Sequence, residues 1–232
     1  MILQGLSLTT MLLRLPAIII ALTFHEFCHG YAAYFLGDRT AKRDGRLSLN
    51  PVRHIDPIGM LMLIIAGFGW AKPVMVNPYN LRNPKQDMAI IAIAGPLSNF
   101  LMAFITILIA YPLVMLVGDG GWDVHRNFDY FRGIAEASGL LGLGFRFLGV
   151  LFFINIGLGI FNLLPIPPLD GSKLLAIFLP DHMYFRFISF RYGFFLLIIL
   201  LVTGTIDFIL GNLLGNIANG LWTLAGWIFF FL

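Results

Sequence analysis

The sequence predicts an all-α membrane protein that crosses the bilayer several times. Hydrophobic residues make up 59% of its 232 residues and charged residues only 12%, whereas soluble domains average about 45–50% apolar and about 25% charged residues. A chain of this length accommodates about five crossings of about 20 residues each, which leaves no room for a separate soluble domain. We therefore expect a single transmembrane domain over residues 1–232, with about five full transmembrane helices and a re-entrant or short β-like membrane segment.

Five long apolar runs are the predicted spans. They cover approximately residues 17–36, 88–117, 140–164, 192–210 and 213–232, and the last two form a closing helical hairpin over residues 192–232. The first run follows Arg14, as the apolar part of a signal peptide would, but no small-x-small cleavage site closes it. We expect this run to be retained as a helix.

The stretch between the first two spans has a different character. Ile58–Ala71 is apolar, but about 14 residues are too few for a crossing. Lys72–Pro78 then combines two prolines with β-branched valines, which favours an extended edge over a helix. Together these features predict a segment that dips into the membrane and returns.

Lysine and arginine are distributed unequally between the predicted loops. Eleven of them fall in three loops on one side of the membrane, and three fall on the other side. The positive-inside rule places the richer loops in the cytoplasm, so we expect a multi-pass protein of the cell membrane with its amino terminus outside. The carboxyl ends of the first and third spans then both face the cytoplasm. The net charge of +3 is too small to indicate nucleic acid binding.

The first span contains the pattern His25-Glu26-x-x-His29. On a helix, the two histidines lie four residues apart on one face, so both imidazoles can bind one metal ion. Glu26 lies beside them, where it can take a proton from a metal-bound water. Two histidines and a glutamate are costly to bury in lipid, which favours a function over the alternative of two histidines packed between helices.

A third metal ligand is expected from the end of the third span. Catalytic zinc usually takes three protein ligands and keeps a fourth position for water. The predicted topology brings Asp170 to the same side of the membrane as His25 and His29. Asp170 follows the proline-rich stretch that begins at Pro165, and such irregular backbone is tolerated at membrane depth where it lines a water-filled cavity. The alternative is an ordinary turn at the interface, and zinc rather than another divalent ion is inferred from the ligand types.

The combined motifs resemble those of the site-2 protease family of intramembrane zinc metalloproteases. The resemblance covers roughly residues 17–180, the expected catalytic core. The matching segments are His25-Glu26-x-x-His29, Gly95-Pro96-x-x-Asn99, Asn162-Leu-Leu-Pro165-Ile-Pro167-Pro-Leu-Asp170-Gly171, Gly45-Arg46-Leu47 to Asn50-Pro51, and Trp70-Ala-Lys-Pro73. The last two segments are similar to those of the compact prokaryotic members, which lack PDZ and CBS domains.

The resemblance implies a role for each matching residue. His25, His29 and Asp170 would hold one Zn²⁺ per chain, and Glu26 would activate the zinc-bound water. Asn162 resembles an asparagine thought to bind the substrate or the developing oxyanion.

We therefore expect a zinc metalloendopeptidase that cleaves peptide bonds in or near the single transmembrane segment of membrane protein substrates. The extended edge that begins at Lys72 is expected to bind the unwound substrate as an added strand. Two alternatives use the same fold: a membrane cation transporter or channel, and an inactive membrane scaffold. Homo-oligomer formation is left open by the sequence.

Overall fold

The computed structural model describes residues 8–66, 69–117, 139–180, 182–183, 187 and 192–231. Its helices are α1 (Leu8–Phe35), α2 (Thr40–Arg43), η1 (Pro51–Arg53), α3 (Pro57–Ala66), η2 (Pro78–Asn80), α4 (Pro84–Val117), α6 (Gly139–Asn162), α7 (Asp170–Ala176), α9 (Gly193–Val202) and α10 (Thr205–Phe231). Most of the predicted outer loop, and the part of the last basic loop that carries Arg186 and Arg191, lie outside the described residues.

Four helices in the described part of the chain are long and apolar enough to cross a membrane. The stretches concerned are Leu12–Phe35 in α1, Pro84–Leu116 in α4, Gly139–Asn162 in α6 and Phe208–Phe230 in α10. The first three agree with the predicted spans, and the set indicates a multi-pass membrane protein.

The expected count of five spans is not confirmed. The predicted fourth span, residues 192–210, contains a helix of only 10 residues, α9, which is too short for a crossing. The reason is a turn at Thr203 and Gly204, where Gly204 adopts φ 71°, a left-handed conformation that favours glycine and ends the helix. The chain then continues as the single helix α10 through Gly211, where the sequence predicted the break.

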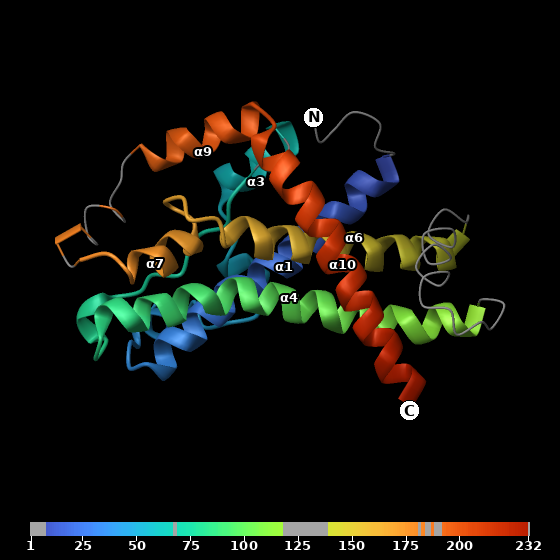
Figure 1. Ribbon diagram of the computed structural model, residues 1–232, viewed down its shortest axis with the longest axis horizontal. Coiled ribbons are helices and arrows are strands. Elements are labelled where there is room, and N and C mark those ends of the chain that lie inside the picture. The colour runs from blue at the N-terminus through green and yellow to red at the C-terminus, as the bar shows by residue number, and fades with distance from the viewer. Residues whose placement is uncertain are drawn as a thin grey trace.

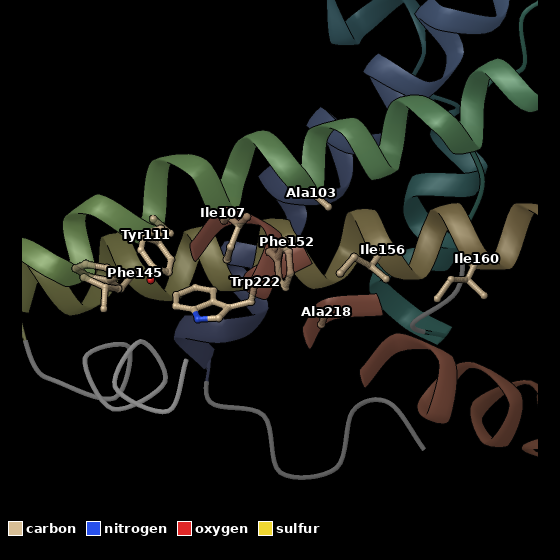
Figure 2. Packing of buried hydrophobic residues seen from close by; sticks show 12 residues of the cluster. Ala103, Ile107, Tyr111, Phe145, Phe152, Ile156, Ile160, Ala218 and Trp222 are labelled. Atoms are coloured by element: carbon tan, nitrogen blue, oxygen red, sulfur yellow. The ribbon is translucent and has the colours of Figure 1, made fainter. Parts of the chain in front are cut away.

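The long helices pack around a shared apolar core. α4 lies beside both α1 and α6, and α10 crosses α4 and α6 obliquely (Figure 1). Figure 2 shows the side chains of this core, among which the rings of Tyr111 and Trp222 lie 5.2 Å apart between their centroids. Ala103 of α4 and Ala218 of α10 are fully or almost fully buried, and such small residues allow the helices to approach closely. This core fixes α4 and α6, which carry much of the site described below.

The segment between α1 and α4 folds back on itself. Ile55 and Ala71 form an isolated antiparallel bridge, and the Lys72 amide donates to the His54 carbonyl oxygen at 2.8 Å. The chain just before the predicted re-entrant segment therefore lies beside the end of that segment, with α3 between them. No β-strand occurs among the residues that the structure describes, so the expected β-like character is limited to this bridge and the extended chain after it.

Asp38 connects this extended chain to the end of α1. Its carboxylate accepts hydrogen bonds from the Asn77 amide at 2.7 Å, from Asn80 Nδ2 at 2.7 Å, and from the amide and hydroxyl of Thr40 at 3.0 and 2.6 Å. Burial tends to raise the pKa of Asp38, but these hydrogen bonds outweigh burial and lower its pKa. The ionised carboxylate thus fixes the position of Asn77 relative to α1.

Candidate active site

Three predicted ligands meet between α1 and the start of α7. His25 Nε2 and His29 Nε2 lie 3.0 Å apart, and Asp170 Oδ2 lies 3.3 Å from the first nitrogen and 3.0 Å from the second. All three residues are buried. The structure therefore brings together side chains that are up to 145 positions apart in a chain of 232 residues.

Their spacing fits a tetrahedral zinc ion. Nitrogen and oxygen ligands about 2.0–2.1 Å from one tetrahedral zinc lie about 3.3–3.4 Å from each other, close to the separations of 3.0–3.3 Å between these atoms. Two neutral imidazoles and one carboxylate are also the ligand types that catalytic zinc commonly takes.

The orientation of both imidazoles supports the same conclusion. His25 Nδ1 lies 2.7 Å from Asn99 Oδ1, and His29 Nδ1 lies 2.7 Å from the carbonyl oxygen of Ile91. Each Nδ1 is therefore the protonated nitrogen that donates to an oxygen, which leaves the lone pair of each Nε2 directed at the shared centre. Lone pairs that converge with a carboxylate oxygen repel one another unless a cation lies between them. With both imidazoles neutral, His25, His29 and Asp170 could therefore hold a cation, and the hydrogen bonds to α4 would orient both histidines.

A chain of two asparagines holds the partner of His25 in place. Asn99 Nδ2 donates to Asn155 Oδ1 at 3.0 Å and to the Ala21 carbonyl oxygen at 3.3 Å. Asn155 Nδ2 in turn donates to the Leu151 carbonyl oxygen at 2.8 Å. Because its amide nitrogen is engaged by acceptors, Asn99 must present its oxygen to His25. α6 therefore helps to set the tautomer of a ligand on α1.

Gly95 allows α4 to approach the ligands. A Cβ atom at this position would lie 2.6 Å from His25 Cε1 and 2.5 Å from His29 Cε1, and it would also overlap His29 Nε2. Real Cβ atoms do not approach other heavy atoms so closely. Any side chain at position 95 would therefore displace the imidazoles.

The proline-rich break after α6 delivers Asp170. α6 ends at Asn162 and α7 begins at Asp170, since the prolines between them cannot continue the helix. A Cβ at Gly171 would lie 2.5 Å from the Leu164 carbonyl oxygen, so only glycine lets α7 start against the end of α6. Asp170 Oδ1 accepts from Lys173 Nζ at 3.0 Å, which leaves Oδ2 directed at the histidines.

The remaining predicted site residues lie as follows. Glu26 Oε2 accepts a hydrogen bond from the Val74 amide at 2.8 Å, so the extended chain after Ala71 contacts the carboxylate beside the metal ligands. Asn162 is the last residue of α6, and its Nδ2 donates to the Leu158 carbonyl oxygen at 3.0 Å. The structure therefore joins Glu26 to the extended chain, and it engages the Asn162 amide nitrogen within its own helix.

The sequence did not assign roles to Asn99, Asn155, Gly95 or Val74. The first three are buried polar or small residues inside apolar spans, a feature that marks functional positions in membrane helices. Gly95 and Asn99 also lie in the Gly95-Pro96-x-x-Asn99 motif, one of those that resemble the site-2 protease family. No sequence pattern indicated the contact of Val74 with Glu26, because this contact uses the backbone amide of Val74.

The chain matches a peptidase family model and several relatives over most of its length. Residues 14–200 match the model of peptidase family M50. The chain is 35% identical to the Bacillus subtilis protein named "Putative zinc metalloprotease YwhC", over 85% of this chain and 83% of that protein.

Two further relatives are more distant. Identity is 28% with "Putative zinc metalloprotease Rip2" of Mycolicibacterium smegmatis, over 82% of this chain and 66% of the relative. Identity is also 28% with "Putative zinc metalloprotease MJ0611" of Methanocaldococcus jannaschii, over 73% of this chain and 72% of the relative. No solved structure matches the chain. The family match and the histidine and aspartate site agree, and the chain belongs to peptidase family M50, the site-2 protease family of zinc metalloproteases.

Proposed function

We propose that this metalloprotease hydrolyses peptide bonds in or near the transmembrane segment of single-span membrane proteins. The observation that carries the proposal is the convergence of His25 and His29, which lie in a helix apolar enough to span a membrane, with Asp170 at the start of α7. A hydrolytic site inside the membrane meets substrates that are themselves in the membrane. Ionisable groups are costly to bury in lipid, so their presence there indicates a function.

Glu26 is the proposed general base. Bound zinc supplies a Lewis acid that lowers the pKa of a water ligand toward about 7 and polarises the scissile carbonyl. Glu26 follows His25 directly in α1, and one of its carboxylate oxygens, Oε2, is held by the Val74 amide. The other oxygen can take the proton of the attacking water and pass it to the leaving amine. Asn162 is proposed to bind the substrate backbone or to donate to the oxyanion.

The extended chain from Lys72 to Asn77 is the proposed docking edge. The Lys72 and Val74 amides point toward His54 and Glu26. Alternate residues of an extended chain point to opposite sides, so the amide and carbonyl of Met75 face away from these partners. The Met75 side chain is 62% exposed. A substrate strand that pairs with Met75 would replace hydrogen bonds lost when its helix unwinds.

The proposed placement in the membrane follows from charge and from the fold. We propose that α3 and the chain back to Ala71 form the re-entrant segment, because the bridge between Ile55 and Ala71 brings its two ends together. We propose that the site opens toward the cytoplasmic side of the cell membrane, because the loops on that side are the more basic ones. The proposed site does not require the chain to form a homo-oligomer.

The substitution Glu26→Gln tests this proposal. A model protein with one transmembrane segment and a tag at each end is co-expressed with either the wild type or the variant. We expect the wild type to separate the tags, and Glu26→Gln to abolish cleavage while zinc content stays at one ion per chain. Unchanged cleavage by the variant would disprove the proposed role of Glu26.

A further inference from the structure

A cavity lies beside the proposed site, between α1, α6 and the folded-back segment. Its volume is about 280 Å³. The walls are mostly apolar side chains such as Leu22 of α1, Met60 of α3 and Leu158 of α6, and residues of α9 and α10 close another side. An apolar cavity of about 150 Å³ is large enough to bind benzene, so this one can hold an aromatic or a branched aliphatic side chain.

The cavity adjoins the proposed general base in two ways. Leu22 and Thr23 line it and precede Glu26 by four and three residues in α1, so they lie on the same helix face one turn away. Ala71 also lines the cavity, and Val74, three residues further along the same extended chain, donates to Glu26. A substrate strand along this chain would therefore place a side chain at the cavity within a few residues of the bond that is cut.

His54 has a buried ring nitrogen without a hydrogen-bond partner. Its side chain lines the cavity and is only 2% exposed. Nε2 lies 2.7 Å from the Ser48 carbonyl oxygen, so Nε2 carries the proton and Nδ1 is an acceptor. Nδ1 has no hydrogen-bond partner among the described residues. A buried acceptor without a partner is costly, and this nitrogen is not accessible from the cavity.

We propose that this cavity is the specificity pocket of the protease, which binds one large apolar side chain of the substrate near the scissile bond. The inference rests on the proposed function and names its substrate class: unwound membrane segments with Phe, Leu, Met or a similar residue at one fixed position. The mostly apolar walls of the cavity match the apolar side chains of an unwound membrane segment.

Gly157 offers a direct way to fill the cavity. It lines the cavity from α6, and a Cβ added there would meet only Leu214 Cδ1, at 3.9 Å, an ordinary contact. Gly157→Leu therefore narrows the pocket without a backbone clash. Gly144→Leu on the same helix is the matched control, because a Cβ at Gly144 has nothing within 4 Å and the residue is not part of the cavity wall.

The first measurement compares cleavage of synthetic single-span peptides that differ at one residue near the mapped cleavage site. We expect the wild type to prefer Phe or Leu over Ala at one position by about tenfold or more in kcat/KM. Gly157→Leu should reverse this preference, and Gly144→Leu should keep the wild-type profile. The same profile in all three proteins would overturn the proposal.

The second measurement does not depend on cleavage. The Glu26→Gln protein is reconstituted with peptides that carry benzoylphenylalanine at successive positions, and cross-links are mapped by mass spectrometry. We expect one peptide position to label Met60 or Leu158, and Gly157→Leu to remove this label. Peptide cross-links found only outside the cavity would overturn the proposal. A parallel experiment with a photoactivatable lipid would also overturn it if the lipid labels the cavity and no peptide does. If the wild type cuts no peptide while this label still forms, the proposed function fails and the pocket assignment stands.

Discussion

The amide of Val74 donates a hydrogen bond to Glu26 Oε2 at 2.8 Å. This contact joins the proposed general base to the chain that is proposed to bind the substrate. It fixes one carboxylate oxygen and leaves the other for a water molecule. The extended segment therefore has two proposed tasks, since it orients the base with one edge and binds the substrate with the other.

Val74→Pro should reduce cleavage because proline has no amide hydrogen to hold Glu26. A misplacement of a catalytic group by about 1 Å costs about 100-fold in rate, and we expect a loss of this order in kcat. Zinc content should stay unchanged, as measured by atomic absorption. Val74→Ala is the control, because it shortens the side chain but keeps the amide. A Val74→Pro protein with the activity of Val74→Ala would show that the contact does not position Glu26.

Gly95→Ala should prevent zinc binding. A methyl group at this position would overlap His29 and lie 2.6 Å from His25 Cε1, so the imidazoles would have to move out of the ligand geometry. We expect purified Gly95→Ala protein to contain little zinc and to be inactive. Gly144→Ala on α6 should retain a full complement of metal, since a Cβ there meets nothing within 4 Å. Full zinc occupancy in the Gly95 variant would contradict the close packing of α4 on the ligands.

Asn99→Ala should weaken zinc binding by about 10–100-fold, which is the usual effect of removing a hydrogen-bond partner of a metal-bound histidine. The variant removes the acceptor of His25 Nδ1 and frees the imidazole to rotate. Competition with a chelator of known affinity measures the change. Asn162→Ala is the contrasting variant: we expect it to bind zinc normally and to cleave more slowly. Equal zinc affinity in wild type and Asn99→Ala would refute the orienting role.

Asp38 should make the stability of the folded protein depend on pH. Its folded pKa lies below its ordinary value of 3.8, so the unfolded state binds the proton first as the pH falls. The contribution is fully present above pH 3.8 and is lost as the pH falls through the lower folded pKa. Asp38→Ala should cost about 1–3 kcal/mol at neutral pH, because it leaves donors unpaired. Thermal unfolding in detergent should show this difference shrinking in acid, and a pH-independent difference would be inconsistent with an ionised Asp38.

Much of the site was predictable from the sequence, because metal chemistry restricts both residue type and spacing. His25 and His29 follow from a helical spacing of four. Asp170 follows from topology, since few carboxylates lie near the required end of a span. In the structure the three proposed ligand atoms lie within 3.3 Å of one another, the proximity that a shared metal ion requires.

Other features depend on tertiary contacts that a sequence pattern does not encode. The break between α9 and α10 lies at Gly204 rather than near Gly211, because only Gly204 takes the left-handed conformation of the two. Hydropathy could not distinguish these glycines, since both lie within the same long, mostly apolar stretch. The contact of Val74 with Glu26 uses the backbone, and no side-chain pattern reports it.

His25, His29 and Asp170 are proposed to share one zinc ion. Anomalous diffraction at the zinc absorption edge, from crystals of the purified protein, tests this proposal. We expect one peak per chain, about 2.0–2.2 Å from Nε2 of both histidines and from Asp170 Oδ2. A zinc peak bound by the histidines with Asp170 beyond bonding distance, or an active protein with no zinc peak at this position, would contradict it.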